Sequence, residues 1–313
     1  MLHRFFILLL AASLIFSLPA CKRKKKEWNP SMGAAERPAE IWKQFSGANA
    51  FHHTQKLVEL GPRLPATEGI EKARSYIIEQ LSKSGWDTIR QTFTDTTPHG
   101  PVEFTNLIAR YRGVGEKNQC VIIASHYDTK KFATFDFVGA NDSGSSTGAL
   151  VEMARVLAKD PNLAWKCELV FFDGEEAFVD FTETDGLYGS RHYARDLRTA
   201  KRAKQFKFGI LWDMIGDKNL TITFPSDSPP HLSRSAFAGA DALGTRKYFS
   251  FFPNPILDDH VPLNLSGIPT INFIDFDYPP WHTAEDTMDK LSPDSIETVA
   301  EVTLWMLRQA WPR

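Results

Sequence analysis

Four short apolar runs constrain the fold of this chain more than any other feature of its sequence. They occupy residues 121–124, 169–172, 208–212 and 270–274. Each run is almost uninterrupted, whereas a strand with one face in water alternates apolar and polar residues. Strands without that alternation are buried on both faces, as they are in a parallel sheet between two layers of helices.

Segments with helical periodicity separate these runs. We expect amphipathic helices at about residues 144–159, 189–200, 231–243 and 294–310, and another from Thr67, which can cap it, to Gly85, which can end it. Before the first run, residues 86–94 and 102–111 have the pattern of two strands joined by a Pro/Gly turn. The sequence therefore predicts an α/β fold, a three-layer single domain with a central mixed, mainly parallel sheet flanked by helices.

Acidic residues and histidines follow the apolar runs. The residues at these positions are His126, Asp128, Asp142, Glu175, Glu176, Asp213 and His282. The carboxyl ends of parallel strands meet at one edge of a sheet, so these side chains can converge in one cleft. A buried carboxylate without a cationic partner is strongly disfavoured, so such a cluster requires a cation. Adjacent residues of an extended chain point to opposite sides, which lets one of Glu175 and Glu176 bind the cation while the other carries a proton.

Each of these residues has an ordinary explanation when it is taken alone. Asp142 could cap the helix that follows it, His126 could be a core histidine, and Asp213 could be a buried acid held by backbone amides. Trp281 could belong to the core. The joint pattern decides, because unrelated acids and histidines rarely all follow strands. Histidine and carboxylate ligands without a thiolate suit a catalytic Zn²⁺, which keeps one coordination position open.

The order His-x-Asp, Asp, Glu-Glu, Asp, His is similar to that of zinc-dependent exopeptidases of the aminopeptidase type. Several segments resemble one branch more closely, the glutaminyl-peptide cyclotransferases (glutaminyl cyclases). These segments are Ser-His-Tyr-Asp-Thr-Lys at 125–130, Phe-Phe-Asp-Gly-Glu-Glu-Ala-Phe at 171–178, Leu-Tyr-Gly-Ser-Arg-His at 187–192, Asp-Asp-His at 258–260 and Trp-His-Thr at 281–283. The resemblance extends from about residue 45 to the C terminus.

The resemblance implies a zinc centre and a set of acids beside it. One zinc ion per chain would be bound by Asp142, Glu176 and His282, with Glu175 as general base and acid and with Asp213 and Asp258 as an acidic network. The substrate would be a peptide or protein with an N-terminal glutamine. Its α-amine would attack its own side-chain amide carbon, releasing ammonia and leaving pyroglutamate. Crowding of the acids predicts that at least one of Glu175, Asp213 and Asp258 has a raised pKa.

The same resemblance implies a substrate pocket lined by Trp281, with Tyr278 and Ile256 as further walls. The chain departs from the animal enzymes of the family at two positions. Phe181 stands where a pocket tryptophan is expected, and Asn272 stands where a histidine would extend the proton network. These departures affect pocket details and pH dependence and leave the three zinc ligands in place.

A hydrolase of the same superfamily is the main rival. In such a di-zinc aminopeptidase, His126 and Asp213 would hold a second metal, Asp142 would bridge the two ions, and Glu175 would activate a water. The ligand types cannot separate the two activities. The insertion at 177–187, the acids at 258–260 and the tryptophan before His282 favour the cyclotransferase. A binding protein on an inactive scaffold is a third reading, but no catalytic residue is missing.

The N-terminal segment has the layout of an export signal. Residues 1–20 combine a positive start, an apolar stretch and small residues, which is typical of a signal peptide of the lipoprotein type. Cys21 would then be acylated, and the basic run at 22–26 would add attraction to anionic headgroups. We expect a polar tether at 21–40, a catalytic domain at 41–313, and a periplasmic or cell-envelope location. An ordinary cleaved signal and an uncleaved anchor remain alternatives.

The charge of the chain limits the kinds of partner that it can bind. Without Arg4 and the five basic residues at 22–26, 30 basic residues stand against 38 acidic ones, a net charge of −8. An acidic body argues against nucleic acid and is compatible with a substrate that carries a free amine. We expect a monomer whose only membrane contact is the lipid at Cys21.

Cys120 and Cys167 each open a predicted strand and are either a disulfide, as export favours, or two buried thiols.

Overall fold

One mixed sheet of eight strands organises residues 40–113 and 119–311, the part of the chain that this computed structural model describes. Its strand order is β1-β2-β4-β3-β5-β8-β6-β7. The strands are β1 Trp86–Thr97, β2 Gly100–Tyr111, β3 Cys120–His126, β4 Cys167–Phe172, β5 Phe206–Asp213, β6 Ile222–Phe224, β7 Phe249–Phe251 and β8 Thr270–Ile274. The four central strands β4, β3, β5 and β8 pair in parallel, and antiparallel pairs join them to β2 on one side and to β6 on the other.

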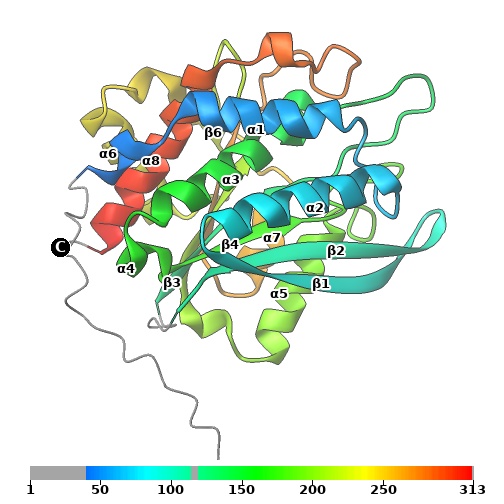
Figure 1. Ribbon diagram of the computed structural model, residues 1–313, viewed down its shortest axis with the longest axis horizontal. Coiled ribbons are helices and arrows are strands. Elements are labelled where there is room, and N and C mark those ends of the chain that lie inside the picture. Colours follow the sequence, from blue (N-terminus) through cyan, green and yellow to red (C-terminus); the bar gives the residue numbers. More distant parts are fainter. Residues whose placement is uncertain (1–39, 114–118, 312–313) are drawn as a thin grey trace, which may run out of the picture. The chain divides into compact units, whose positions relative to one another are not determined.

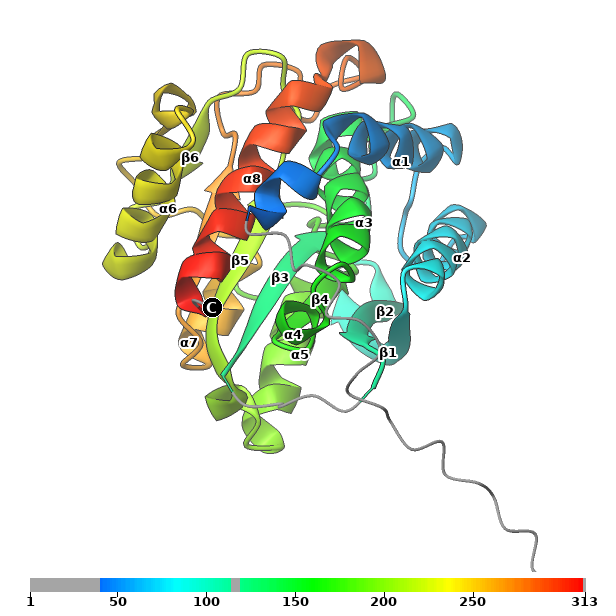
Figure 2. The same cartoon turned by 60° about the vertical axis from the view of Figure 1, so that its left-hand side comes forward.

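Helices cover both faces of the sheet (Figures 1 and 2). The helices are α1 Gly47–Glu59, α2 Glu68–Lys83, α3 Ser146–Leu157, α4 Pro161–Ala164, α5 Tyr188–Thr199, α6 Pro230–Ala242, α7 His260–Leu265 and α8 Pro293–Ala310. Short helical turns occur at η1 Ile41–Gln44, η2 Ala140–Ser145, η3 Ala203–Gln205, η4 Arg246–Tyr248 and η5 Met288–Lys290.

Strand β3 shows how the three layers are held together. Its side chains alternate between the two faces, and all are buried, so both faces must be apolar. Val121 and Ile123 pack into the core beneath α1, α2, α3 and α8. Ile122 and Ala124 pack into a second core with residues of α5 and α7. The predicted three-layer α/β domain with a mixed sheet and a parallel centre is therefore confirmed.

The predicted elements appear with small shifts at their ends. All four apolar runs lie within strands of the parallel centre. The helix expected from Thr67 is α2, and Thr67 occupies its N-cap position. However, the Thr67 hydroxyl donates to the carbonyl of Leu64 at 2.6 Å and caps no helical amide. The helix expected from residue 144 begins at Ser146, because η2 precedes it.

The two cysteines remain free thiols, and the sheet gives the reason. Val121 and Cys167 are register partners in parallel strands, so their side chains share one face. Cys120 precedes Val121 and therefore points to the other face, where it joins the second core. The disulfide alternative thus does not hold in this structure.

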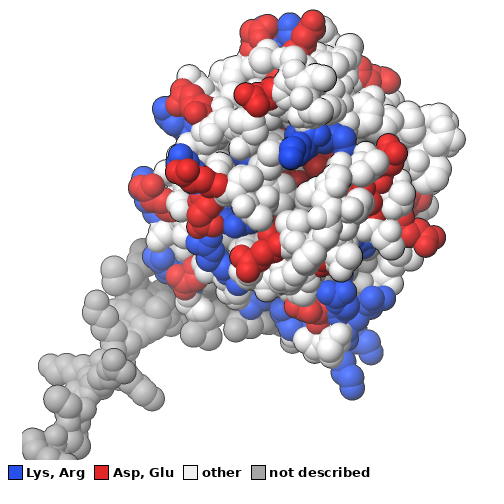
Figure 3. Space-filling view, turned by 90° about the vertical axis from the view of Figure 1, so that its right-hand side faces the viewer, with Lys and Arg blue, Asp and Glu red and all other residues white. Residues whose placement is uncertain are grey.

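The predictions for residues 1–39 lie outside the described residues. These are the signal peptide at 1–20, the acylated Cys21 and almost all of the tether at 21–40. Among the helices that the structure describes, none is long and apolar enough to cross a bilayer. Figure 3 shows one face of the molecule, where acidic and basic side chains are interspersed with neutral surface.

Candidate active site

Three predicted metal ligands meet beyond the carboxyl ends of the central strands. His282 Nε2 lies 3.3 Å from an oxygen of Asp142 and 3.2 Å from an oxygen of Glu176. Glu176 follows β4, Asp142 lies in η2 after β3, and His282 lies in the loop after β8. Residues separated by 140 positions in the sequence are thus brought together by the parallel order of the strands, as the sequence predicts.

The backbone around Asp142 is shaped by a neighbouring glycine and a distant acid. Gly139 has φ +52°, and a Cβ there would lie 1.9 Å from the carbonyl oxygen of Asp142. Only glycine fits this close approach. The carboxylate of Asp286 accepts the backbone N–H groups of Asn141 at 2.8 Å and of Asp142 at 3.1 Å. Because Asp286 lies four residues after His282, it ties the loops of two candidate ligands together.

His282 itself has a left-handed backbone conformation, with φ +56°. A residue with a Cβ adopts this conformation only when its surroundings enforce it, and such residues concentrate at functional sites. Trp281 stacks on the His282 ring with centroids 4.3 Å apart, and Phe137 meets that ring edge-on at 5.9 Å. These ring contacts help to hold the imidazole in the orientation that faces the carboxylates.

Asp128 positions the two adjacent glutamates. Its carboxylate accepts the backbone N–H of Glu175 at 3.1 Å and the backbone N–H of Glu176 at 3.3 Å. It is fully buried and also lies 3.4 Å from Nδ1 of His126. The sequence offered a signal for this role, since Asp128 follows His126 by two residues at the end of β3, but no role was predicted for it.

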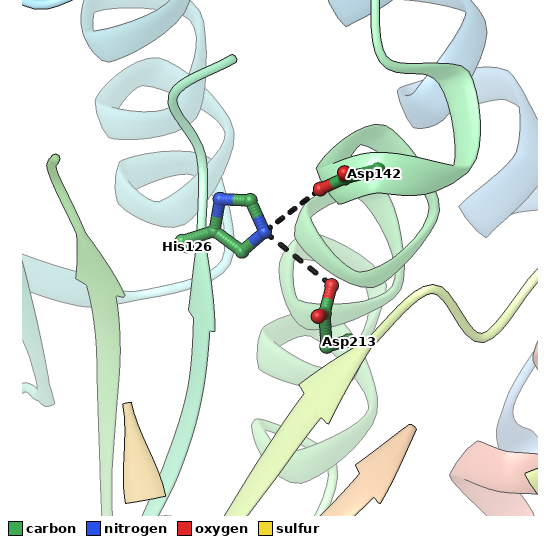
Figure 4. Close-up of side chains that lie close together, drawn as sticks. All are labelled: His126, Asp142 and Asp213. Atoms are coloured by element: carbon green, nitrogen blue, oxygen red, sulfur yellow. Dashed lines mark hydrogen bonds and ion pairs between the residues drawn. The ribbon is translucent and has the colours of Figure 1, made fainter. Parts of the chain in front are cut away.

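A second cluster shares Asp142 (Figure 4). Nε2 of His126 lies 3.2 Å from Asp142 Oδ1 and 3.3 Å from Asp213 Oδ1. All three side chains are buried. The single-residue explanations for Asp142 and Asp213 find no support: Asp142 does not cap α3, and Asp213 faces an imidazole.

The donor set suits a small divalent cation. Within the described residues, two groups have three donors close enough to share one ion, Asp142–Glu176–His282 and His126–Asp142–Asp213. Two ligands at about 2.0–2.1 Å from a tetrahedral zinc lie roughly 3.3 Å apart, which matches the separations around His282. Oε2 of Glu176 is buried without a hydrogen bond from a described residue. The residues thus fit the zinc that their chemistry implies.

The acids beside these ligands have perturbed pKa values. Burial first, and then the charges of Glu176 and Asp258, hold the pKa of Glu175 well above its usual range. Burial also raises the pKa of Asp213 to about 7, against the lowering effect of the His126 hydrogen bond. Burial acts in the same direction on Asp142, but hydrogen bonds from His126 and His282 bring its pKa below the usual range. The predicted rise among Glu175, Asp213 and Asp258 is confirmed for the first two.

These groups line a pocket of about 260 Å³ that is open to solvent. Its polar lining consists of Asp142, Glu175, Glu176, Asp213, Asp258 and His282. Its apolar walls include Phe181, Ile256 and Trp281, three of the four residues predicted to contact substrate. Trp281 is 38% exposed, so it forms part of the pocket mouth and does not belong to the core.

Tyr278 differs from its prediction as a pocket wall. It is buried, it is not among the pocket residues, and its hydroxyl donates to Asp286 at 2.8 Å. It therefore helps to hold Asp286, the acid that bonds to the backbone of Asn141 and Asp142. Asn272, which replaces an expected histidine, donates to Asp258 at 2.6 Å. The amide thus supplies one hydrogen bond to the acidic network, although it cannot carry a proton as a histidine does.

An α/β sheet whose parallel strands end in a histidine–carboxylate cluster defines the class of metal-dependent exopeptidase folds. The sequence pattern of peptidase family M28 matches residues 106–307, and the chain belongs to this family. The structure of an Acidobacteriales bacterium glutaminyl cyclase is similar at 35% identity and a TM-score of 0.78, covering 85% of this chain and 94% of that one. Porphyromonas gingivalis glutaminyl cyclase matches at 29% identity and a TM-score of 0.76, covering 85% and 98%.

A curated relative agrees with the structural neighbours. Glutaminyl-peptide cyclotransferase of Dictyostelium discoideum is 28% identical over 306 residues, covering 83% of this chain and 84% of the relative. The resemblance inferred from the motifs is therefore confirmed at the level of the family.

Proposed function

We propose that this chain is a zinc-dependent glutaminyl-peptide cyclotransferase, which converts an N-terminal glutamine of a peptide or protein into pyroglutamate and ammonia. One observation carries the proposal. A single pocket combines the three donors Asp142, Glu176 and His282 with the uncoordinated acid Glu175 and with apolar walls. The cyclotransferases among its relatives support the choice of reaction.

The pocket fits the glutamine side chain and its free amine. The methylene groups of glutamine can lie against Phe181, Ile256 and Trp281, the apolar walls of the pocket. The acids at the base of the pocket favour the positively charged α-amine over a blocked N terminus. Because the attacking and leaving groups belong to one residue, holding that residue bent supplies much of the acceleration.

Glu175 is proposed to move the proton. The α-amine attacks in its neutral form, after giving its extra proton to solvent, and Glu175 as a carboxylate takes one further proton from it while the new C–N bond closes the ring. It then delivers that proton to the side-chain nitrogen, which leaves as ammonia, so the protons balance within one turnover. Burial and the neighbouring charges keep the pKa of Glu175 high, and a high pKa suits a group that must release its proton to a leaving amine. Asp213 and Asp258 are proposed to hold this acidic network in place.

Zinc bound by Asp142, Glu176 and His282 would supply Lewis acidity toward the side-chain amide oxygen. The chain's own contribution is to fix those three side chains. Asp286 holds the Asp142 backbone, and the stacked Trp281 holds the His282 ring.

A di-zinc aminopeptidase is the second candidate, and one observation favours it. Nε2 of His126 faces both Asp142 and Asp213 at hydrogen-bond distance, so a second ion sharing Asp142 has its ligands in place. Glu175 would then activate a water for hydrolysis of the first peptide bond.

A peptide that begins with glutamine separates the two activities. The cyclotransferase returns the same peptide lighter by one ammonia, while an aminopeptidase returns it shorter by whole residues. The acetyl-blocked peptide is the matched control, since it has no free amine to attack. Elemental analysis supplies a second measure, with one zinc per chain expected for cyclisation. Stepwise shortening together with two metals per chain would overturn the proposal.

Export and anchoring are proposed on the sequence alone. Residues 1–20 would be removed as a signal, Cys21 would carry the lipid, and residues 41–313 would form the catalytic domain, acting as a monomer in the periplasm or cell envelope. Mass spectrometry of the native protein tests this proposal, because an unmodified Cys21 excludes the lipid.

A further inference from the structure

One wall of the pocket is a loop that follows the two glutamates. Residues 178–186 form part of the connection between β4 and α5, and Phe181 is the residue of this loop that lines the pocket. Val179 is 55% exposed, and Asp180 is exposed too. A loop with so much of its chain in water needs an internal constraint if Phe181 is to keep one position.

The carboxylate of Asp185 supplies that constraint. It accepts the backbone N–H groups of Phe178 at 2.8 Å, Val179 at 2.9 Å and Asp180 at 3.3 Å. The hydroxyl of Tyr188 donates to it as well, at 2.9 Å. Only 4% of Asp185 is exposed, so four donors converge on a nearly buried charge. Hydrogen bonds to a charged acceptor are stronger than neutral ones.

Asp185 stays charged under ordinary conditions. Burial alone would raise its pKa, but the hydrogen bonds from the three backbone amides and Tyr188 bring the pKa below the usual value. The loop is closed further at its other end, where the backbone N–H and carbonyl of Asp185 bond to Thr182. Asp185 therefore fixes the chain on both sides of Phe181.

Phe181 rests on the backbone that Asp185 fixes. A Cβ on Gly186 would lie 2.7 Å from the Phe181 ring, so the ring packs directly against that glycine. Gly186 has φ +95°, a conformation that other residues rarely adopt. The ammonium of Lys130 lies 5.4 Å from the centre of the Phe181 ring and donates to the carbonyl of Ala177 at 2.8 Å.

We propose that Asp185 is a positioning residue that sets the place of Phe181 and thereby the shape of the substrate pocket. It touches neither the reacting atoms nor the metal ligands, so its effect passes through Phe181. The identity of the substrate rests on the proposed function, but the positioning role does not. Loss of Asp185 weakens substrate binding and leaves the chemical step nearly unchanged, because a pocket wall contacts ground state and transition state alike.

A double-mutant cycle on the zinc-loaded enzyme tests the proposal. We expect Asp185→Ala and Phe181→Ala each to raise KM for a glutamine-initiated peptide about 10-fold, with kcat changed less than about 3-fold. The double variant should match Phe181→Ala alone, because Asp185 has nothing left to position. Asp180→Ala removes an acid from the same loop but leaves the Asp185 carboxylate and its hydrogen bonds in place, so this variant should behave like the wild type.

Limited chymotrypsin digestion measures how readily the loop opens to a protease, independently of any enzyme activity. Cleavage after Phe181, located by mass spectrometry, should become at least about 10-fold faster in Asp185→Ala and stay unchanged in Asp180→Ala. If Asp185→Ala does not fold, Asp185→Asn keeps the shape without the charge, and intermediate changes in KM and cleavage are expected.

Two results would overturn the proposal. One is wild-type cleavage and KM in the Asp185 variants, and the other is KM effects that multiply in the double variant. If the wild type shortens peptides instead of cyclising them, the proposed function fails, yet the same cycle on the peptide it cleaves still decides the role of Asp185.

Discussion

Replacing Glu175 by glutamine separates catalysis from structure at this site. The substitution keeps the size of the side chain and removes its ability to take up a proton. Glu175 is not among the three expected metal ligands, and its backbone N–H still has Asp128 as acceptor in the variant. We therefore expect Glu175→Gln to bind zinc and to lose turnover.

The magnitude follows from the role of the residue. A positioned general acid–base contributes roughly 10²–10⁴-fold to a rate, which corresponds to about 3–5 kcal/mol of activation free energy. The folded state should not lose stability, because burial and the charges of Glu176, Asp258 and Asp259 disfavour an ionised Glu175, against the opposing effect of His126. Removing one of several crowded like charges relieves repulsion.

The assay combines three measurements on one preparation. Ammonia release gives kcat and KM, elemental analysis gives zinc content, and thermal unfolding gives Tm. The reasoning predicts kcat lower by at least about 100-fold, with full zinc occupancy and a Tm no lower than that of the wild type. Full activity would refute the proton role. Loss of zinc together with a lower Tm would show instead that Glu175 is needed for the metal site.

Three further predictions address the metal, pH and packing. Chelation should abolish activity and lower Tm by about 5–10 °C, because an ion at about 100 times its Kd adds about 2.7 kcal/mol to the free energy of unfolding. Added Zn²⁺ should restore both activity and Tm. Asp275→Asn should stabilise the protein most at high pH: burial raises the pKa of Asp275 to about 7, so ionisation costs stability as pH rises. From that shift we expect a gain of about 4 kcal/mol at pH 8 and about 2 kcal/mol at pH 5, measured by urea unfolding. Gly148→Ala should destabilise by about 1–3 kcal/mol despite a better helix propensity, because its Cβ would lie 2.4 Å from Thr54 Oγ1, and an increase in the urea midpoint would contradict this.

Sequence patterns only a few residues long predict the layers of the fold and the sheet edge where the site lies. Continuous apolar runs indicate strands buried on both faces, and parallel order then brings their carboxyl ends together. This reasoning brings Asp142, Glu176 and His282 to one edge of the sheet with the other acids that follow strands, and the resemblance to the cyclotransferases then singles out these three as ligands. Sequence spacing cannot show whether two cysteines meet. Cys120 and Cys167 open neighbouring strands, but a register offset of one residue turns their side chains to opposite faces of the sheet.

Residues that position the site were not predictable, because their partners are remote in sequence. Asp286 bonds to the backbone of Asn141 and Asp142, and only the folded loops bring them within reach. The same contact explains why Tyr278 is not the pocket wall that the resemblance implies, since its hydroxyl donates to Asp286. The left-handed conformation of His282 is likewise imposed by its surroundings and has no signature in its residue type.

Neither the metal ligands nor the pocket walls, taken alone, distinguish cyclisation from hydrolysis. Both reactions use the same carboxylates and histidines, and His126 and Asp213 are present for either. Hydrolysis requires an ordered water beside the metal, whereas cyclisation requires a dry pocket in which the glutamine side chain bends toward its own amine. Phe181, Ile256 and Trp281 come from three different loops, and each presents an apolar surface next to Glu175. An aminopeptidase can use such walls to hold an apolar first residue, so the choice of cyclisation rests on the cyclotransferases among the relatives of this chain.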